Sequence, residues 1–435
     1  MEYWNPAIEC IKEEKLKEIQ IKRLKDTVNK IYENVPYYAK KMDDLGIDPH
    51  DIVSLADLKK LPFTNKEDLR ITYPFGMFAT PMEDIVRIHA SSGTTGKQTV
   101  VGYTKDDIRT WSENMARCLV MAGVSKASKV QICYGYGLFT GGLGVHYGVE
   151  LVGAAAVPAS TGNTERQINM LKDFQSTCLC CTPSYALYIA DTLNKAGIKK
   201  NELHLTSGIF GAEPWTEEMR REIEERLGIK AYDIYGLSEI MGPSIAQECE
   251  CQNGLHIWED NFIPEIIDVE TEEVLEDGKL GNLVITTINK QGLPLIRYKT
   301  GDICSLSHKK CNCGRTHARL TKLKGRTDDM LIIRGVNIFP TQIESALLNF
   351  SETSPYYQII VDRVHNLDRL TVDFELFDEE IFGNEDEQRK IKNSISKKIE
   401  SVIGIAVNIN ILKANSIQRY EGKARRVVDN RMMSL

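Results

Sequence analysis

The sequence predicts an α/β protein: a large N-terminal domain with helix-flanked mixed or parallel sheets and a smaller β subdomain, then a small α+β C-terminal domain. Two observations favour this class. Between about residues 85 and 235, short strand-like runs alternate with helical stretches, which is typical of a parallel sheet covered by helices. From 263 to 307, hairpin signals replace this alternation and indicate antiparallel strands.

The individual elements follow from local patterns. Apolar residues recur at helical spacing between 11 and 31, which predicts an amphipathic helix. Further helices are expected at 166–174, 184–196 and 385–402. Strands are expected in short apolar or β-branched runs at 130–134, 154–157, 231–234, 263–269, 283–288, 358–363, 370–376 and 407–412. Two domains are therefore expected, at 1–325 and 326–435, and the second is large enough to fold by itself.

Composition excludes several classes of function. The 435 residues have a net charge of -7, which argues against nucleic acid or an anionic membrane as the main partner. No apolar run approaches the roughly 18 residues that a membrane span needs. The N-terminal segment has no apolar core of signal-peptide length. Eleven cysteines without a secretory signal indicate reduced thiols, so we expect a cytoplasmic protein.

The segment 91–99 has the composition of a loop that wraps phosphate groups. Its glycines allow backbone N–H groups to approach oxygen atoms, and its hydroxyl groups and lysine add donors and positive charge. The spacing excludes a Walker A loop, since two residues separate Gly93 from Gly96 where that motif has four. The candidate phosphate-binding residues are Ser91, Ser92, Gly93, Thr94, Thr95, Gly96 and Lys97.

Four later segments suit the same chemistry: 235–239 (YGLSE), 298–302 (YKTGD), 325–340 and 419–425 (RYEGKAR). Singly, each is as typical of a turn or a core strand as of a site. Taken together with the 91–99 loop, in this order and at these separations, they resemble the adenylate-forming superfamily of acyl-CoA synthetases, luciferases and peptide-synthetase adenylation domains.

The resemblance covers essentially the whole chain and narrows to one family. The segments 62–70 (PFTNKEDLR), 73–76 (YPFG), 211–215 (GAEPW), 254–256 (GLH) and 332–340 (IIRGVNIFP) are similar to those of phenylacetate–CoA ligases. The resemblance implies a two-step reaction. A carboxylate attacks the α-phosphorus of ATP to give an acyl-adenylate and pyrophosphate, and the thiolate of coenzyme A then displaces AMP.

The resemblance also implies roles for single residues. Lys423 would reach from the small domain to the carboxylate and the α-phosphate, where a compact positive charge suits oxygens that become more negative. Glu239 would bind Mg²⁺, which prefers carboxylate oxygen and substrate phosphates. Asp302 would accept both ribose hydroxyl groups. The other implied ATP-binding residues are Gly211, Ala212, Glu213, Pro214, Asp233, Tyr235, Gly236, Leu237, Ser238 and Arg326, with Tyr235 stacked on adenine.

The small domain is expected to be mobile, because in this superfamily it rotates between the two half-reactions. Asp328 matches the hinge position, and Gly335 matches a glycine that lines the coenzyme A tunnel. Each also has a purely structural interpretation, since Asp328 lies in a charged loop and Gly335 could serve a turn.

The acyl group is expected to lie against the segment 134–142, which forms a wall of the acyl site in such ligases. Tyr136, Phe139, Ala212, Ile240 and Pro243 would suit an aromatic ring on a short arm, although ordinary core aromatics give the same pattern. A dinucleotide-binding fingerprint is rejected here, because Thr140 replaces the third glycine and no acidic partner follows at the expected distance.

A second cluster of residues suits a metal. Cys249, His256, Cys311 and Cys313 are zinc-ligand types, and two pairs from separate segments can complete a tetrahedron. Similar ligases carry Cys, Gly-Leu-His and Cys-x-Cys at matching places, so we expect structural zinc there, with Cys251 as the spare thiol. Reduced thiols beside a histidine remain the alternative. Cys178, Cys180 and Cys181 are expected to be core residues instead.

We therefore expect an ATP-dependent ligase that joins an arylacetate-like acid to coenzyme A, with small-molecule substrates and, by family resemblance, a homodimer. One alternative is an adenylyltransferase of the coenzyme F390 synthetase type, which stops at nucleotidyl transfer. Another is an inactive binding protein on the same fold, against which Lys423, Glu239 and Asp302 argue. The acceptor is expected to be free coenzyme A, since the sequence shows no segment that resembles a carrier domain.

Overall fold

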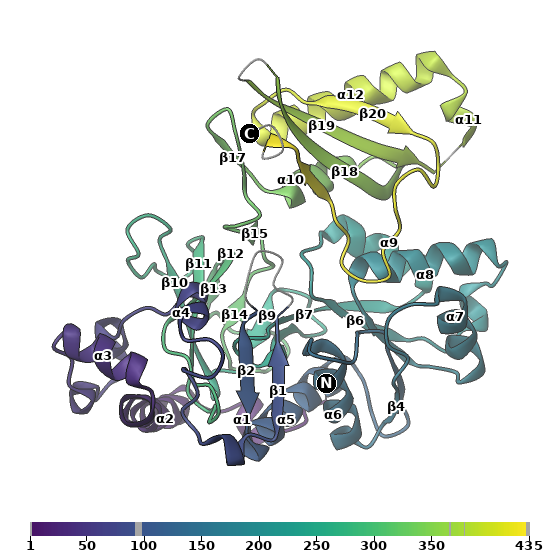
Figure 1. Cartoon of the computed structure of the whole chain (residues 1–435). Helices are drawn as coiled ribbons and strands as arrows, with labels where there is room; N and C mark the ends of the chain where they lie inside the picture. The colour runs from purple at the N-terminus through teal and green to yellow at the C-terminus, as the bar shows by residue number, and fades with distance from the viewer. Residues whose placement is uncertain (1, 92–97, 365–366, 378, 432–435) are drawn as a thin grey trace.

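The computed structural model describes residues 2–91, 98–364, 367–377 and 379–431, which form a large domain with a smaller domain above it (Figure 1). The chain begins with helices that pack along one side of the large domain. These are α1 (Pro6–Glu9), α2 (Glu13–Asn34), α3 (Pro36–Asp44) and α4 (Lys66–Ile71), with short 3₁₀ turns η1 (Pro49–Asp51), η2 (Leu55–Lys60) and η3 (Met82–Asp84). The expected amphipathic helix is α2, which buries Leu24, Val28 and Ile31.

A nine-stranded mixed sheet forms the centre of the large domain, in the order β13-β14-β9-β8-β7-β6-β5-β3-β4. Its members are β3 (Lys129–Ile132), β4 (Ala155–Val157), β5 (Cys178–Cys181), β6 (Ser207–Gly211), β7 (Lys230–Leu237), β8 (Gly242–Glu248), β9 (Leu255–Ile257), β13 (Leu306–Ser307) and β14 (Arg319–Leu320). The β4-β3-β5-β6-β7 part is parallel and the rest is antiparallel. The predicted helix-flanked parallel sheet is therefore confirmed.

Helices cover both faces of this sheet. They are α5 (Lys105–Met121), α6 (Gly141–Val152), α7 (Thr164–Asp173), α8 (Pro183–Lys195), the turn η4 (Lys200–Glu202) and α9 (Glu217–Leu227). Strand β5 shows how the two faces are separated: Cys178 and Cys180 belong to one hydrophobic cluster, and Leu179 and Cys181 to the other. Side chains alternate across a strand, so a run that is buried on both faces is apolar throughout. The predicted core role of these cysteines is confirmed.

A smaller β subdomain lies beside the central sheet. It comprises the hairpin β1 (Arg87–Ala90) and β2 (Val100–Tyr103), and the antiparallel sheet of β10 (Phe262–Ile267), β11 (Gly281–Thr287), β12 (Tyr298–Cys304) and β15 (Gly325–Arg326). The motif at 298–302 forms the first five residues of β12. In this sheet Asp302 is paired directly with Arg326, which places two candidate site residues opposite each other.

The small domain is built around one sheet against which helices pack. It contains the hairpin β16 (Leu331–Ile333) and β17 (Val336–Ile338), helices α10 (Pro340–Leu347), α11 (Glu379–Phe382) and α12 (Glu385–Ile403), and strands β18 (Thr353–Val364), β19 (Leu367–Leu376), β20 (Asn408–Leu412) and β21 (Val427–Asp429). The sheet order is β20-β19-β18-β21. On α12, Ile391, Ile395 and Ile399 recur every four residues, which places them on one face in the core of this domain.

The fold differs from the expectation mainly at element ends. Strand β7 continues through 235–237, which the sequence had placed after the strand. Strand β21, which follows the lysine segment and pairs in parallel with β18, was not expected. The domain boundary at 325/326 stays a prediction; β15 pairs in the large domain's sheet and β16 begins at Leu331. No helix among the described residues is both long and apolar enough to cross a membrane.

Candidate active site

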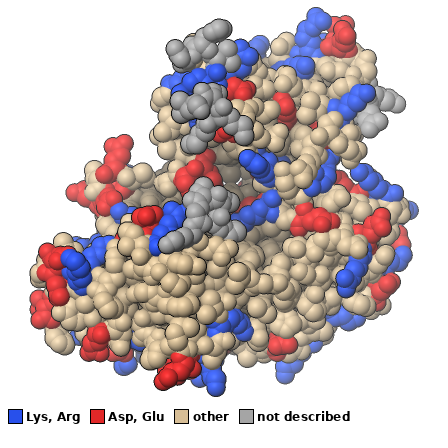
Figure 2. Space-filling view, viewed as in Figure 1, with Lys and Arg blue, Asp and Glu red and all other residues tan. Residues whose placement is uncertain are grey.

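The candidate site lies at the carboxyl ends of two neighbouring parallel strands, where ligands bind in open α/β sheets. Strand β6 ends at Gly211, which is paired with Ile234 of β7. Ala212 follows with φ of +71°, a left-handed conformation that an alanine rarely adopts. Backbone strain of this kind is tolerated where the surrounding structure fixes it. A hollow edged by basic and acidic side chains separates the two domains in the space-filling view (Figure 2).

Asp302 is the centre of a buried hydrogen-bond network. The Tyr235 hydroxyl donates to Asp302 Oδ2 at 2.6 Å, and Arg326 donates to Asp302 Oδ1 at 3.0 Å. Burial raises the pKa of Asp302, and the Arg326 charge opposes this rise. Each carboxylate oxygen keeps a second lone pair, so Asp302 can still accept hydrogen bonds from a ligand. Tyr235 itself is buried, with its hydroxyl committed to Asp302.

Arg326 connects this network to the predicted hinge. Its Nε donates to Asp328 Oδ1 at 2.8 Å, and a second guanidinium nitrogen lies 3.3 Å from Asp328 Oδ2. Burial acts to lower the pKa of Arg326, but the carboxylates of Asp302 and Asp328 have the larger combined effect. The pKa of Arg326 is therefore raised above its ordinary value. One always-charged side chain therefore joins the candidate ribose acceptor to the candidate hinge.

Glu239 is buried and contacts Thr99, the last residue of the predicted phosphate-loop segment 91–99. Thr99 donates to Glu239 Oε1 at 3.2 Å, and the Thr99 hydroxyl lies 2.5 Å from that of Ser91. The other predicted phosphate ligands, Ser92, Gly93, Thr94, Thr95, Gly96 and Lys97, lie outside the described residues. Ser91 and Thr99 flank these residues in the sequence, and Thr99 contacts Glu239 directly. A carboxylate beside such a loop has the chemistry to hold Mg²⁺ against phosphate oxygens.

Lys290 is a site residue that the sequence analysis missed. It is fully buried, and its Nζ donates to the backbone oxygens of Glu239 at 3.0 Å and Ile240 at 2.5 Å. The ammonium group also lies 4.7 Å from the centre of the Tyr103 ring. Burial lowers the pKa of Lys290 to about 7, and the carboxylates of Asp107 and Glu239 oppose this shift. No local motif marks it, because its function depends on backbone atoms far away in the sequence.

The predicted acyl-pocket residues come from three segments: the stretch before α6, the turn after β6, and the turn between β7 and β8 with the start of β8. Thr140 and Ser238 are hydrogen-bonded at 3.1 Å, which joins the segment before α6 to the turn after β7. Gly144 allows α6 to approach closely: a Cβ there would lie 2.7 Å from Pro243 Cγ. Tyr136 is half-buried and its hydroxyl lies 3.3 Å from His146 Nδ1. The remaining members differ in exposure, with Phe139 partly exposed, Ala212 half-buried at the end of β6, and Ile240 fully buried.

Other predicted nucleotide residues line the same strand ends. Asp233 is buried within β7, and its backbone N–H donates to Glu248 at 2.8 Å. Gly236 is closely packed, since a Cβ there would lie 2.2 Å from the oxygen of Gly242. Leu237 ends β7, and Pro214 follows Glu213 in the half-buried turn after β6.

The structure brings the predicted catalytic lysine to this site. Three contacts join the loop 421–426 to the large domain: Thr164 donates to Glu421 at 3.0 Å, Thr182 donates to the Gly422 oxygen at 3.0 Å, and Glu213 accepts the Ala424 N–H at 3.0 Å. Lys423 is solvent-exposed, but surrounding protein lowers its pKa by desolvation, while Glu213 opposes that shift. Asp302, Arg326 and Asp329 also act on the charge of Lys423.

Gly335 lies apart from this group, in the turn of the β16–β17 hairpin of the small domain. Arg334 and Gly335 have φ of +51° and +78°, as a two-residue hairpin turn with both central residues left-handed requires. A Cβ on Gly335 would meet no atom within 4 Å. Its role in binding coenzyme A stays a prediction.

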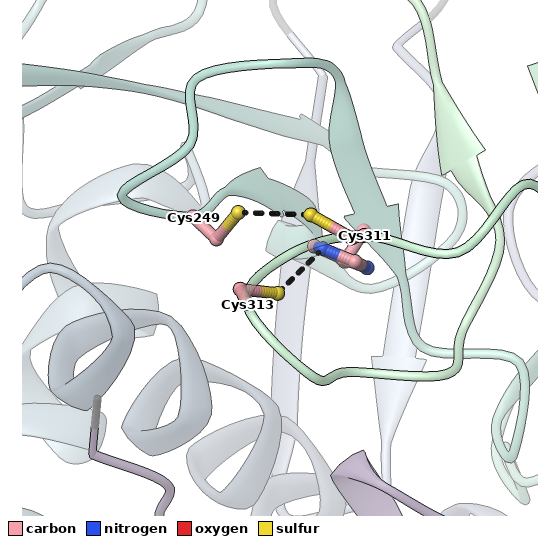
Figure 3. A group of neighbouring side chains, drawn as sticks. Cys249, Cys311 and Cys313 are labelled. Carbon is pink, nitrogen blue, oxygen red and sulfur yellow. Dashed lines mark hydrogen bonds between the residues drawn. The ribbon is translucent and has the colours of Figure 1, made fainter.

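The four predicted metal ligands meet in one cluster (Figure 3). Cys249, His256, Cys311 and Cys313 place one ligand atom each within 4.8 Å of all the others. The Sγ atoms of Cys249 and Cys311 are 3.7 Å apart, and Cys313 Sγ lies 3.3 Å from His256 Nε2. Hydrogen bonding from Cys249, followed by the effect of His256, lowers the pKa of Cys313. Three thiols and an imidazole at these separations fit tetrahedral zinc.

The surroundings of the cluster also suit a metal. His256 Nδ1 lies 3.1 Å from the backbone oxygen of His317, so an Nδ1–H donated there leaves the Nε2 lone pair for a ligand bond. Cys251, the expected spare, is half-buried and lies outside the group of four.

Comparison with known proteins agrees with this geometry. The model of the AMP-binding enzyme family matches residues 22–289, and that of the AMP-binding enzyme C-terminal domain matches residues 335–431. Phenylacetate-coenzyme A ligase of Thermus thermophilus is 46% identical over 98% of this chain and 99% of its own length. The ligase of Pseudomonas putida is 50% identical, with 96% and 95% covered. The chain belongs to the phenylacetate–coenzyme A ligase family.

Solved structures confirm the fold and identify the domain arrangement. The crystal structure of 2-hydroxyisobutyryl-CoA ligase in the postadenylation state has a TM-score of 0.93 at 27% identity, with 99% of this chain and 93% of that chain covered. The same ligase in the thioesterification state gives a TM-score of only 0.73, over 99% and 92%. Because the enzyme is the same, the two scores differ through its conformation. The two domains of this chain are therefore arranged as in the postadenylation structure.

The buried Lys290 predicts a pH-dependent stability. Its folded pKa of about 7 lies below its ordinary value of 10.5, so between these values the unfolded chain binds more protons. Stability is therefore expected to rise with pH, by about 2 kcal/mol between pH 7 and pH 9 from this residue alone. Denaturant unfolding of the wild type and of Lys290→Met at both pH values, without Mg²⁺, measures this contribution. An identical pH dependence in both proteins would show that Lys290 stays charged.

Proposed function

We propose that this enzyme converts an arylacetic acid, ATP and coenzyme A into the arylacetyl-CoA thioester, AMP and pyrophosphate. The observation that carries the proposal is the position of Lys423, whose loop is docked on the large domain by the hydrogen bond from the neighbouring Ala424 N–H to Glu213. Four relatives at 46–50% identity, each covered over at least 95% of its length, are phenylacetate-coenzyme A ligases. These relatives do not favour an adenylyltransferase that stops at nucleotidyl transfer.

In the first half-reaction, the carboxylate of the acid attacks the α-phosphorus of ATP. Lys423 would face the oxygens that gain negative charge, and a cation that the docked loop holds in position stabilises that charge. Asp302, held by Tyr235 and Arg326, accepts hydrogen bonds from the ribose hydroxyl groups. Glu239 is the residue that would hold Mg²⁺, whose charge offsets that of the phosphate oxygens when it is bound.

In the second half-reaction, the thiolate of coenzyme A attacks the acyl carbon and AMP leaves. We infer that the small domain rotates about Asp328 for this step, which withdraws Lys423 and brings the β16–β17 hairpin with Gly335 to the site. The Asp328–Arg326 ion pair supports this inference, because it joins β15, the last strand of the large domain, to the segment that leads to β16, the first strand of the small domain.

The acid is inferred from the wall of the acyl site. Tyr136 and Phe139 precede α6, and Pro243 lies against its glycine-rich first turns. An aromatic ring gains favourable edge and face contacts beside such residues. The relatives' substrate, phenylacetate, fits this chemistry, and indoleacetate is a second candidate of the same class.

We also propose a structural zinc ion on Cys249, His256, Cys311 and Cys313. The first and third of these lie 62 residues apart, so a bound metal closes a long loop between β8 and the segment after β13. Four protein ligands leave no open position for substrate, which supports a structural role. A cytoplasmic location, which the free cysteines support, and a homodimer, which the family resemblance implies, are parts of the same proposal.

The substrate assignment predicts an acid preference. Phenylacetate and indoleacetate should support AMP formation with kcat/KM on the order of 100-fold above acetate or 2-hydroxyisobutyrate, because the short acids leave an aromatic-lined pocket unfilled. AMP release from a panel of acids, with and without coenzyme A, measures this. A preference for short aliphatic acids would overturn the substrate class, and full AMP release without coenzyme A would overturn thioester formation.

The zinc assignment predicts about one zinc ion per chain. Cys311→Ser should remove the metal and lower the melting temperature by on the order of 5 °C or more, while the activity of folded molecules changes little. Cys251→Ser is the matched control and should keep its zinc. Elemental analysis and thermal unfolding measure both effects. Metal-free wild-type protein would contradict the site, and loss of zinc in Cys251→Ser would contradict this set of ligands.

A further inference from the structure

Glu213 forms a connection between the two domains that its place in the sequence does not suggest. Its Oε1 accepts the backbone N–H of Ser184 at 2.8 Å, in the first turn of α8 in the large domain. Its Oε2 accepts the N–H of Ala424 at 3.0 Å, in the loop of the small domain. Ala424 directly follows Lys423. A single carboxylate therefore ties the catalytic lysine's own backbone to the scaffold that carries the nucleotide site.

The large-domain end of this connection is rigid. Gly211 ends β6 against β7 so closely that a Cβ would lie 2.3 Å from the oxygen of Ile234. The strained φ of +71° at Ala212 then sets the direction of the chain into Glu213. Burial raises the pKa of Glu213, while the hydrogen bond from Ser184 and the charge of Arg426 oppose that rise. A carboxylate that is fixed at its base in this way can position the partner that it binds.

The loop 421–426 makes further contacts with the large domain on either side of Ala424. Thr164 donates to Glu421, and Thr182 donates to the Gly422 oxygen, each at 3.0 Å. Beyond Ala424, a guanidinium nitrogen of Arg426 lies 3.4 Å from the Ser184 hydroxyl. Among these contacts, Glu213 is a charged side chain that accepts a backbone N–H of the loop. Hydrogen bonds to a charged acceptor are stronger than those between neutral groups.

We propose that Glu213 is a positioning residue for adenylate formation, which holds Lys423 in place by binding the Ala424 N–H across the domain interface. This inference rests on the proposed role of Lys423. The contact joins the two domains, so it exists only while the small domain is docked as described here. Glu213 should therefore matter in the first half-reaction and not in the second, whereas a contact to adenine would matter for the affinity of ATP.

The test uses the full-length enzyme and separates the half-reactions. Glu213→Ala removes both hydrogen bonds, and Glu213→Gln keeps the shape but places an amide donor against one of the two N–H groups. Both should slow acid-dependent ATP–pyrophosphate exchange on the order of 10- to 100-fold at unchanged KM for ATP. Thioester formation from supplied phenylacetyl-adenylate and coenzyme A should stay within about twofold, which also shows that the variants fold.

A second measurement does not depend on activity. Release of the loop 421–426 should increase the rate of tryptic cleavage after Lys423 in both Glu213 variants. Glu225→Gln, an exposed carboxylate on α9, is the matched control and should behave as the wild type in every assay.

The outcomes separate this inference from the role of the lysine. Lys423→Ala serves as the reference variant, and its retention of exchange would overturn the role of Lys423 itself. If Lys423→Ala loses exchange, normal exchange in Glu213→Ala would overturn the positioning role alone. A raised KM for ATP at unchanged kcat would overturn it in favour of an adenine contact. Equal losses in both half-reactions would overturn it in favour of general stability.

Discussion

The docking of the loop 421–426 on the large domain is the interaction on which the proposed chemistry depends. The small domain folds around its own core, with the isoleucines of α12 packed on its sheet. In the proposed mechanism, it brings Lys423 to the nucleotide site only while the loop contacts Thr164, Thr182 and Glu213. Each of these residues lies near the carboxyl end of a parallel strand or at the start of the helix that follows. The parallel sheet therefore places the proposed substrate site and the contacts of the second domain at the same edge.

A second constraint connects the site with the movement of the domains. The antiparallel pairing of β12 with β15 places Asp302 opposite Arg326, and Arg326 in turn binds Asp328. In the proposed mechanism, nucleotide binding at Asp302 and rotation at Asp328 would therefore act on the same guanidinium group, that of Arg326. Exposed ion pairs are weak, so the Arg326–Asp328 bond can break without a large cost, whereas the buried Asp302 end remains fixed. This difference suits a hinge that must turn once in each catalytic cycle.

The sequence was sufficient for the fold class because the signals were local. Alternating runs gave the parallel sheet, and the cysteines at 178–181 were assigned to the core from their apolar neighbours. The family motifs also predicted Lys423, Asp302 and the four zinc-type ligands; the structure brings the four ligand atoms within 4.8 Å of one another and docks the loop of Lys423 on the large domain. The roles of Lys423, Asp302, Asp233 and Gly335 are not tested by the structure and stay predictions.

The sequence could not show contacts made through backbone atoms or across large separations. Lys290 supports Glu239 through backbone carbonyl oxygens, and any residue type at position 239 would offer the same acceptor. Glu213 was placed in the adenine pocket from its motif, although its carboxylate binds two backbone N–H groups in different domains. Such partners follow from tertiary structure alone, since every residue except proline carries the same N–H and carbonyl groups.

We infer that one chain carries out two reactions by turning its small domain about Asp328. Asp328→Pro tests it most directly, because proline restricts φ at the position that must turn. Asp328→Ala, which removes the carboxylate but keeps the backbone free, is the control. Asp328→Pro is expected to retain ATP–pyrophosphate exchange while thioester formation from supplied acyl-adenylate falls on the order of 100-fold. Thioester formation at the wild-type rate in Asp328→Pro would contradict rotation about this residue.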